Sequence, residues 1–354
     1  MSEKLLNRKT TRQINVGGVK IGGGAPISVQ SMCTTDTRDV EATVHQLNQF
    51  HAAGCDIARL AVLDMDAARA IRDIKERTNI PIVADIHFDY RLALECARSG
   101  VDKIRINPGN IGSPDRVRAV ADACGEKGIP IRIGVNGGSL EKELLEKYGH
   151  PTAEALCESA MGHIRLLEDC GFHDIALSIK SSDVPLMVEA YEKISSMIDY
   201  PLHLGVTEAG TEYTGIIKSS IGIGALLLRG IGDTLRVSLT ADPVKEVRAG
   251  IELLKALGLR GGARLTSCPT CGRCQIKNMI DIAGEVSDRL EGIDKDIHVA
   301  VMGCVVNGPG EAREADIGFA CGDGVALLFK RGEILRKVPI GEAVDELFAE
   351  IKKM

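Results

Sequence analysis

The amino-acid sequence predicts an α/β protein in which an N-terminal (β/α)8 barrel of the TIM type is followed by a smaller α/β domain. Short apolar runs rich in β-branched residues alternate with amphipathic stretches through most of the 354-residue chain. Eight such repeats within about 240 residues match a barrel of this kind in number and length. The repeat stops near residues 258–262, where a different order of elements begins.

The eight apolar runs are the predicted barrel strands, and they cover residues 26–32, 56–62, 81–87, 103–108, 130–136, 174–182, 201–208 and 234–240. The amphipathic stretches between them predict helices that include residues 40–53, 66–77, 90–99, 113–127, 152–170 and 184–197. Strands that are apolar on both faces indicate a parallel sheet covered by helices. An open doubly wound sheet is the alternative, but its usual glycine-rich phosphate fingerprint does not follow Met32.

The predicted domain boundary divides the chain into residues 1–259 and residues 260–354. After the boundary, the pattern predicts a helix over residues 276–290 and strands over residues 298–302 and 316–320. A hairpin follows, with strands at residues 325–329 and 334–338, and a helix over residues 342–353 ends the chain. This second region has an ordinary domain size.

Composition excludes several classes of protein. The net charge of -6, an aromatic content of 3% and the lack of Trp are atypical of a nucleic-acid-binding protein. Residues 1–12 have no apolar core typical of a secretory signal, and no run approaches the roughly 18 apolar residues of a membrane span. An odd number of cysteines, 11, argues against a fully paired disulfide framework and for a reducing compartment. We therefore expect a cytoplasmic protein.

Polar residues gather at the carboxyl ends of the predicted strands, where the active sites of barrels lie. They mostly occupy every second position of a strand, and the positions between them are apolar. Because side chains alternate between the two faces of a strand, we expect the polar residues to converge inside the barrel. The set comprises Arg59, Asp85, His87, Arg105, Asn107, Arg132, Asn136, Ser178, Lys180, Ser182, His203, Thr207, Glu208, Arg236, Ser238 and Thr240.

Two interpretations fit this polar set. The residues form an internal salt-bridge network, in which Asp85 and Glu208 neutralise some of the cations. Alternatively, the cations outnumber the carboxylates because the site binds an anion, and arginine suits phosphate recognition. We favour a phosphorylated or diphosphorylated small molecule.

The cysteines fall into two groups. Six lie singly along the barrel and are expected to be small core residues: Cys33, Cys55, Cys96, Cys124, Cys157 and Cys170, of which Cys33 is also a candidate pocket residue. Five lie in the second domain: Cys268, Cys271, Cys274, Cys304 and Cys321. Their spacing predicts a metal site and favours an iron–sulfur cluster over a structural zinc, because a second Cys-x2-Cys pair is missing. Spacing leaves open whether Cys274, Cys321 or a non-cysteine group completes the site.

Two motifs of the second domain closely resemble the 4-hydroxy-3-methylbut-2-enyl-diphosphate synthase family of the methylerythritol phosphate route to isoprenoids. These motifs are CPTCGR at residues 268–273 and MGCVVNGPGE at residues 302–311. The resemblance extends along the barrel, in residues 26–35, 54–62, 84–88, 105–109, 134–138 and 207–214. The length is similar to that of the two-domain bacterial form.

The resemblance implies a [4Fe-4S] cluster held by Cys268, Cys271, Cys304 and Glu311. It implies that 2-C-methyl-D-erythritol 2,4-cyclodiphosphate binds in the barrel mouth and is reduced by two electrons to 4-hydroxy-3-methylbut-2-enyl diphosphate and water. It also implies flavodoxin or ferredoxin as the electron donor. A homodimer is expected, with the cluster domain of one chain over the barrel of the other.

Roles follow for individual residues. Arg59, Arg105, Arg132 and Lys180 would hold the diphosphate, with His203 in the same binding set. Asn107, Asn136 and Asn307 would orient substrate oxygens. Glu208 or Asp85 would transfer protons, and Glu311 would move aside to free one iron. Cys274 is expected to be a bystander.

Two other functions stay open on the residues alone. One is a barrel enzyme that acts on a phosphorylated substrate and carries a structural zinc domain. The other is an iron–sulfur electron carrier or redox sensor whose barrel is not catalytic.

Overall fold

The computed structural model describes residues 8–274, 276–293, 295–304, 312–322 and 324–354. The chain divides into two compact units, Met1–Leu259 and Arg260–Met354. Each unit has its own buried apolar cluster. No helix within the described ranges combines the length and the apolar character needed to cross a bilayer.

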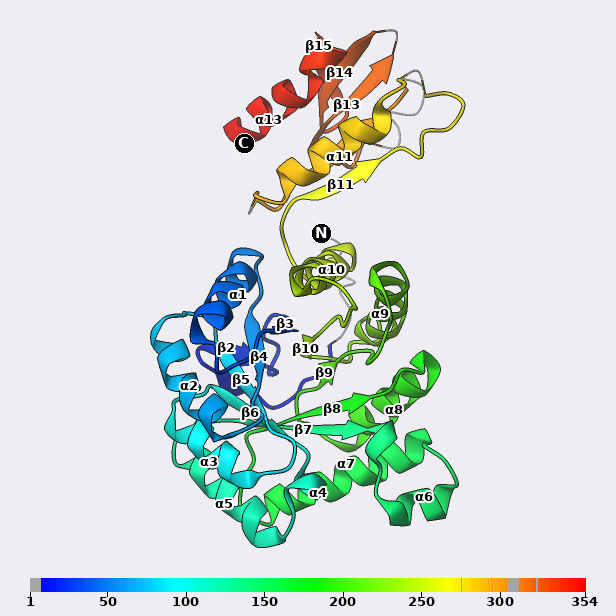
Figure 1. Cartoon of the computed structure of the whole chain (residues 1–354). Helices are drawn as coiled ribbons and strands as arrows, with labels where there is room; N and C mark the ends of the chain where they lie inside the picture. The colour runs from blue at the N-terminus through cyan, green and yellow to red at the C-terminus, as the bar shows by residue number, and fades with distance from the viewer. Residues whose placement is uncertain (1–7, 275, 294, 305–311, 323) are drawn as a thin grey trace. The chain divides into compact units, whose positions relative to one another are not determined.

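The first unit is the predicted barrel (Figure 1). Its eight parallel strands are β3 (Ser28–Met32), β4 (Ile57–Ala61), β5 (Ile82–Asp85), β6 (Lys103–Ile106), β7 (Ile131–Asn136), β8 (Ile175–Lys180), β9 (His203–Leu204) and β10 (Thr234–Leu235). Neighbours in space follow the order β8-β7-β6-β5-β4-β3-β10-β9. A parallel bridge between Leu177 and Leu202 joins the two ends and completes the circle.

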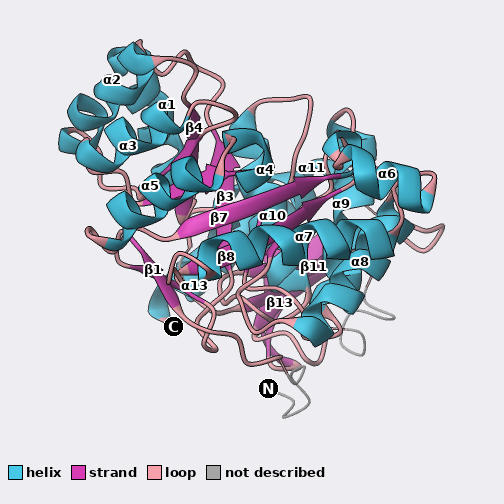
Figure 2. Cartoon of the chain, turned by 90° about the horizontal axis from the view of Figure 1, so that it is seen from below, coloured by secondary structure: helices cyan, strands magenta, loops and turns pink. Residues whose placement is uncertain are grey.

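Helices cover the outside of the strands (Figure 2). They are α1 (Val40–Ala52), α2 (Met65–Glu76), α3 (Tyr90–Arg98), α4 (Pro108–Ile111), α5 (Pro114–Gly125), α6 (Lys142–Tyr148), α7 (Ala153–Glu168), α8 (Val184–Met197), α9 (Glu212–Leu227) and α10 (Pro243–Ala256). The strand positions that were expected to face them, such as Ile104, Ile133 and Leu177, lie in one apolar cluster with helix side chains. Aspartates cap several of these helices, as Asp64 does where its side chain accepts from the backbone N–H of Ala67.

An N-terminal hairpin closes one end of the barrel, and the sequence did not predict it. Its strands are β1 (Ile14–Val16) and β2 (Val19–Ile21), paired antiparallel. Ile14, Val16 and Ile21 pack with the inward-facing side chains Ile57 and Val83. The hairpin therefore forms an apolar floor under the amino ends of the strands.

The second unit is a five-stranded sheet with two helices. The strands run in the order β11 (Arg264–Ser267), β12 (His298–Met302), β13 (Ile317–Gly322), β14 (Val325–Lys330) and β15 (Glu333–Pro339). The first three are parallel and the last three antiparallel to their neighbours. Helices α11 (Met279–Leu290) and α13 (Ala343–Lys353) contribute side chains to its apolar cluster. The sequence predicted these elements except β11, whose residues are half-exposed or exposed.

Candidate active site

Inward-facing side chains of the barrel form successive levels because alternate strands contribute to each level. Following the strand register from the hairpin upward gives five levels. The floor level is Ile57, Lys103, Ala176 and Thr234, and the second level is Gln30, Val83, Arg132 and His203. Above them come the arginine level (Arg59, Arg105, Ser178, Arg236), the glycine level (Met32, Asp85, Gly134, Gly205) and the rim level (Ala61, Asn107, Lys180, Ser238).

A cavity of about 120 Å³ runs down from the rim through these levels. It is polar, and its walls include Arg59, Lys180, His203, Thr207 and Arg236. Of the two glycines of the glycine level, Gly205 lines the cavity. The cavity brings together seven members of the predicted polar set, mainly at β8, β9 and β10: Arg59, Ser178, Lys180, His203, Thr207, Arg236 and Ser238. His87, Ser182, Glu208 and Thr240 are instead exposed.

Asp85 is the carboxylate that neutralises part of the arginine level. Its Oδ1 accepts from Arg105 Nη1 at 3.2 Å, and its Oδ2 lies 3.8 Å from Arg59 Nε. Burial alone would raise the pKa of Asp85, but the two guanidinium groups outweigh it and hold the pKa below its ordinary value. Asp85 is thus an ionised partner of two arginines.

Arg236 has a different partner, Glu246 of α10, which the sequence analysis did not identify. Glu246 accepts from Arg236 Nε and Nη2, both at 3.2 Å, and from the Ser31 hydroxyl at 2.9 Å. Its side chain is only 3% exposed. The sequence did not indicate a buried role for Glu246 because this residue lies in an amphipathic helix, where a charged residue normally faces water.

The second level and the floor hold cations with no carboxylate in hydrogen-bond contact. Arg132 and Lys103 are fully buried, and none of their side-chain nitrogens has a hydrogen-bond partner among the described residues. Burial, together with the other cations, lowers the pKa of both groups well below the ordinary values. Burial also keeps the pKa of His203 well below its usual range, with Arg132 and Lys103 adding to the effect, so its imidazole is neutral.

Lys180 is the basic residue of the rim level. Burial first, and then the charges of Arg59, Arg105 and Arg132, lower its pKa to about 5. An anion placed beside this amine would favour the ammonium form and raise the pKa again. Lys180 is therefore suited to take up a proton when an anionic ligand binds.

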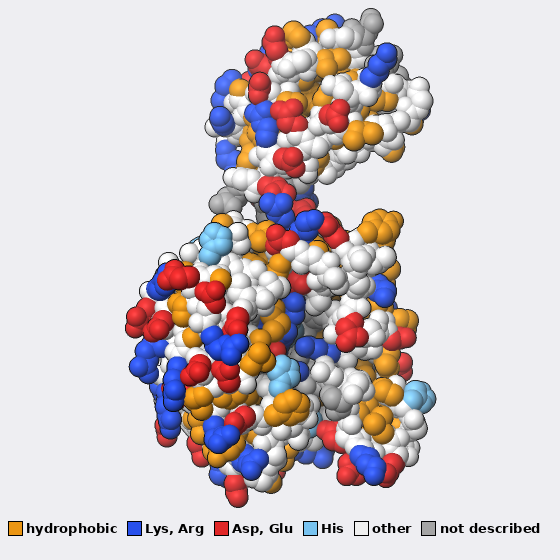
Figure 3. All heavy atoms as spheres, viewed as in Figure 1, with side chains coloured by type: hydrophobic (Ala, Val, Ile, Leu, Met, Phe, Trp, Pro, Cys, Tyr) orange, Lys and Arg blue, Asp and Glu red, His pale blue; other side chains and the backbone are white. Residues whose placement is uncertain are grey.

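The charges of this interior do not balance. Among the described residues, Asp85 and Glu246 contact three of its basic side chains, Arg59, Arg105 and Arg236. Arg132 and Lys103 have no hydrogen-bond partner there, and Lys180 lines the cavity as a sixth basic residue. Figure 3 shows Lys and Arg side chains in the hollow of the barrel unit, although both signs are mixed over its outer surface. Buried cations without partners are costly, so this excess favours an anionic ligand over a closed salt-bridge network.

Gly134 sets the position of Arg105. A Cβ added at this glycine would collide with the guanidinium of Arg105, which the Asp85 carboxylate and the backbone carbonyl of Gly134 hold in place. Close approach of the guanidinium to backbone therefore requires glycine here.

Gly134→Ala is expected to displace Arg105 and to weaken binding of an anionic substrate at least about tenfold, since a charge-assisted contact contributes 1.5–3 kcal/mol. Overpacking should cost about 1–3 kcal/mol of unfolding free energy. Substrate affinity and urea unfolding measure the two effects. Gly162→Ala in α7 is the control, because a Cβ there meets nothing within 4 Å. Unchanged affinity in Gly134→Ala would contradict a binding role for Arg105.

The remaining predicted barrel residues differ in their setting. Asn107 is buried, and its Oδ1 accepts from the Gly109 N–H as the N-cap of α4. Asn136 ends β7 and is half-buried, with a side-chain oxygen that has no partner among the described residues. Glu208 is exposed and has a φ of 51°, a conformation that is strained for a residue other than glycine.

One sequence-based candidate does not belong to this site. Cys33 packs in the helix-facing cluster, because Met32 and not Cys33 has the inward parity. Burial raises the pKa of the Cys33 thiol to about 12.

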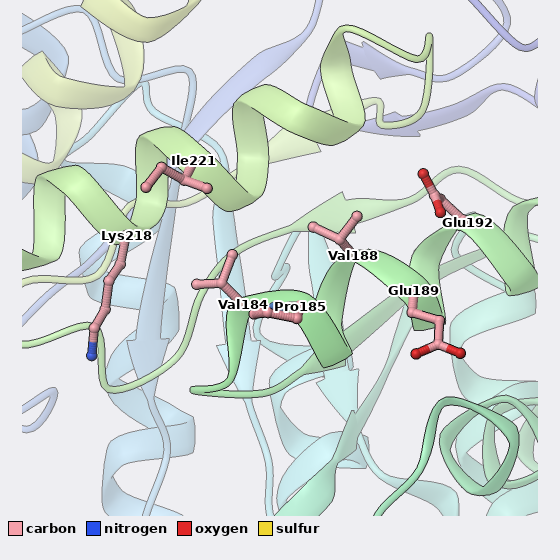
Figure 4. Close-up of a pocket in the computed structure, with 7 residues that line it drawn as sticks. All are labelled: Val184, Pro185, Val188, Glu189, Glu192, Lys218 and Ile221. Atoms are coloured by element: carbon pink, nitrogen blue, oxygen red, sulfur yellow. The ribbon is translucent and has the colours of Figure 1, made fainter.

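A groove of about 500 Å³ on the outer surface lies between α8 and α9 (Figure 4). Its walls are mainly apolar, including Val184, Val188 and Ile221, with Glu189, Glu192 and Lys218 at its edges. Two carboxylates and one ammonium do not select an anion. The smaller cavity inside the barrel is therefore the candidate active site.

Cysteines of the second unit follow the carboxyl ends of two of its strands, whereas Cys321 lies within β13 and is buried. Cys268 follows β11 and Cys304 closely follows β12, and these strands are parallel neighbours. The N–H of Gly303 donates to Cys268 Sγ at 3.1 Å. Cys271 is exposed, and hydrogen bonds from the backbone and side chain of Arg273 lower the pKa of its thiol. This region therefore places several thiols close together in sequence and space, and thiols are ligands that iron and zinc take in proteins.

The structure does not bring all the predicted metal ligands together. Within the described ranges, no three His, Cys, Asp or Glu side chains are assembled around one point at metal-binding distance. Glu311 and Asn307 lie outside the described residues. All eleven cysteines are free thiols, and five of the six barrel cysteines are buried, as expected for core residues.

Comparison with protein families matches residues 11–251 to the GcpE TIM-barrel domain and residues 264–353 to the GcpE protein C-terminal domain. A relative from Geobacter sulfurreducens is 62% identical over 345 residues, which cover 97% of this chain and 98% of the relative. One from Clostridium perfringens is 60% identical over 348 residues, covering 98% and 99%. Both are named 4-hydroxy-3-methylbut-2-en-1-yl diphosphate synthase (flavodoxin).

Solved structures show the barrel fold alone. The truncated 3-deoxy-D-arabino-heptulosonate 7-phosphate synthase of Thermotoga maritima matches with a TM-score of 0.51 at 15% identity, covering 70% of this chain and 94% of that one. The family matches together cover nearly all of both units, and the sequence resemblance is confirmed. The chain therefore belongs to the GcpE family, with a TIM-barrel domain and a C-terminal domain of that family.

Proposed function

We propose that this chain reduces 2-C-methyl-D-erythritol 2,4-cyclodiphosphate to 4-hydroxy-3-methylbut-2-en-1-yl diphosphate and water, with two electrons and two protons. The observation that carries the proposal is the unbalanced cationic cavity of a barrel whose relatives, 57–62% identical over nearly their whole length, bear the name of that synthase. A cyclic diphosphate is an anion of the class that this cavity favours.

The proposed roles of the two units follow. Residues 1–259 would bind the diphosphate, and residues 260–354 would hold a [4Fe-4S] cluster. Cys268, Cys271, Cys304 and Glu311 are the proposed ligands, which agrees with the gathering of thiols at the β11–β12 edge. When bound, such a cluster supplies the two electrons and an iron that can accept a substrate oxygen.

The barrel residues would act by position and charge. Arg59, Arg105 and Arg236 form one level beneath the substrate, and Lys180 would bind the diphosphate from the rim as an ammonium ion. Donors fixed in this way stabilise negative charge on the leaving phosphate oxygen without reorganisation. Arg132 supports the site from the level below.

Glu208 is the better candidate for proton transfer. Asp85 is ionised and fixed between two arginines, so a proton on it would break both pairs. Glu208 is exposed next to the cavity-lining Thr207, and its backbone is held in a strained conformation. Strained residues of this kind cluster at functional sites.

The proposed partners extend the same function. Flavodoxin is the proposed electron donor, as the relatives' name indicates, with ferredoxin as the alternative. A homodimer is proposed in which the cluster unit of one chain serves the barrel of its partner. The eleven free thiols agree with a location in the cytoplasm.

Arg132→Ala should separate substrate binding from cluster assembly. The variant loses a buried cation beneath the site, so we expect the KM to rise at least about tenfold, as for the loss of one charge-assisted contact. Iron and sulfide per chain, measured anaerobically, should not change. Loss of iron in this variant would show a coupling between the units that the proposal does not contain.

Metal analysis of the unmodified protein separates the alternatives. A colourless protein with one zinc per chain would favour a barrel enzyme with a structural zinc domain. A brown protein that accepts electrons but forms no allylic diphosphate would favour an electron carrier.

A further inference from the structure

Cys274 has no place among the proposed cluster ligands, yet its sulfur lies beside one of them. A Cβ added to Gly303 would lie 2.5 Å from Cys274 Sγ and 3.1 Å from Cys268 Sγ. Both sulfurs therefore lie within 3.1 Å of one point, on the same face of residue 303. The Gly303 N–H donates to Cys268 Sγ, which fixes one of the two.

The local chain path favours this pair over the other cysteine pairs. The N–H of Cys274 donates to the carbonyl of Cys271 at 2.8 Å, and this turn brings Cys274 back toward Cys268. Cys271 itself is exposed and hydrogen-bonded to Arg273. Cys321 is fully buried in the apolar cluster from β13, where an oxidant has little access.

We propose that Cys268 and Cys274 form a reversible disulfide when the cluster is absent, and that Cys274 thereby protects a cluster ligand from irreversible oxidation. The protective role rests on the proposed cluster, whereas the disulfide rests on the geometry at Gly303. The absence of a side chain at Gly303 leaves the space in which the two sulfurs can approach each other to the bonded distance of about 2 Å.

The oxidation is balanced with a peroxide as the oxidant. The Cys268 sulfur attacks a peroxide oxygen, the O–O bond breaks, and a sulfenic acid and one water form. The Cys274 sulfur then attacks the Cys268 sulfur, the S–O bond breaks, and a second water leaves. Two thiols lose two electrons and two protons, and one peroxide becomes two waters. A cellular dithiol reopens the bond by exchange.

Without a neighbouring thiol, the sulfenic acid reacts with a second peroxide, which adds one oxygen to the sulfur and leaves as water. The product is a sulfinic acid, which an ordinary reductant does not reverse. A serine at position 274 would leave Cys268 open to this loss. The ligand set would then be destroyed by oxidation that the natural chain survives.

The test uses the full chain, freed of iron by a chelator under anaerobic conditions and treated with one equivalent of hydrogen peroxide. Trypsin cuts after Arg264, Arg273 and Lys277, so the bond links the peptide 265–273 to the peptide 274–277. We expect that linked pair by mass spectrometry, with the loss of two of the eleven thiols. The link should persist in Cys271→Ser and disappear in Cys268→Ser. Far-UV circular dichroism checks that each variant folds.

A second experiment measures how well Cys274 protects Cys268 from irreversible oxidation. After excess hydrogen peroxide and then dithiothreitol, the natural chain should regain most of its iron on reconstitution, and Cys274→Ser at least about threefold less, with a sulfinic acid on Cys268. A link that survives in Cys268→Ser, or one from Cys274 to Cys321, would overturn the proposal, as would no link at all. If the linked peptides form but the natural chain binds no iron, the proposed cluster fails and the disulfide stands.

Discussion

Asp85→Asn should lower the free energy of unfolding of the barrel by about 3–5 kcal/mol, the usual cost of removing one partner from a buried ion pair. The change removes the negative charge that faces Arg59 and Arg105 while it keeps the side-chain volume. Both arginines are almost fully buried, so water cannot replace the carboxylate. Urea unfolding followed by circular dichroism measures the loss.

Asp199→Asn is the matched control, because Asp199 forms an exposed ion pair with Arg12 at 2.9 Å. An exposed pair contributes little, so the control should change stability by no more than about 1 kcal/mol. Equal losses in the two variants would show that Asp85 is not the counter-ion of the arginine level. Added pyrophosphate should stabilise Asp85→Asn more than the natural chain, because it supplies the missing negative charge.

The difference in unfolding free energy between the natural chain and Asp85→Asn should also depend on pH. The folded pKa of Asp85 lies below that of the unfolded chain, so its contribution is present above the unfolded value of about 3.9. It is lost as the pH falls through the folded pKa. The stability difference between the natural chain and Asp85→Asn should therefore stay constant from neutral pH to about pH 4 and shrink only at lower pH.

Cys268→Ser should abolish turnover, with a loss of at least about a thousandfold, because the variant removes a thiolate from the proposed cluster. Iron per chain should fall below a tenth of the natural value, on the same argument. The barrel should still bind the cyclic diphosphate, measured by calorimetry. Cys274→Ser is the control and should hold as much iron as the natural chain under anaerobic conditions. A control that loses its iron would make Cys274 a ligand.

Mixing two impaired chains tests the proposed dimer, with activity assayed at a substrate concentration well below the natural KM, where Arg132→Ala alone turns over slowly. Arg132→Ala impairs the barrel and Cys268→Ser impairs the cluster unit. If the cluster unit of one chain serves the barrel of its partner, a mixed dimer contains one intact pair and regains activity. No recovery after subunit exchange would show that each chain works with its own two units.

The barrel was predictable because its signal is local and repeated. Runs such as residues 103–108 carry isoleucine at every second position, and the polar positions between them fix the inward parity of Arg105 and Asn107. The same parity excludes Cys33 from the cavity. The ends of the strands were less predictable. In β9 and β10, regular strand pairing covers only two residues each. The side chains of Thr207 and Ser238, which follow these strands, nevertheless still line the cavity.

Features that depend on contacts distant in the chain were not predictable. The strands of the β1–β2 hairpin have only three residues each, too few for a clear alternating pattern. Their apolar side chains are explained by packing against Ile57 and Val83, which are distant in the sequence. The sequence around Glu246 does not distinguish it from a solvent-exposed residue of an amphipathic helix. Only the folded structure shows that Arg236 lies beside it. The approach of Cys274 to Cys268 depends on a turn and on Gly303, about thirty residues away.

The apolar hairpin floor has a kinetic consequence for the barrel. It packs under the amino ends of the strands with Ile14, Val16 and Ile21, so apolar side chains of the described residues block that end of the barrel. A ligand that enters the cavity past the rim residues would therefore leave in the same direction. Product that dissociates slowly would then delay the next turnover, because it occupies the space that the next substrate needs.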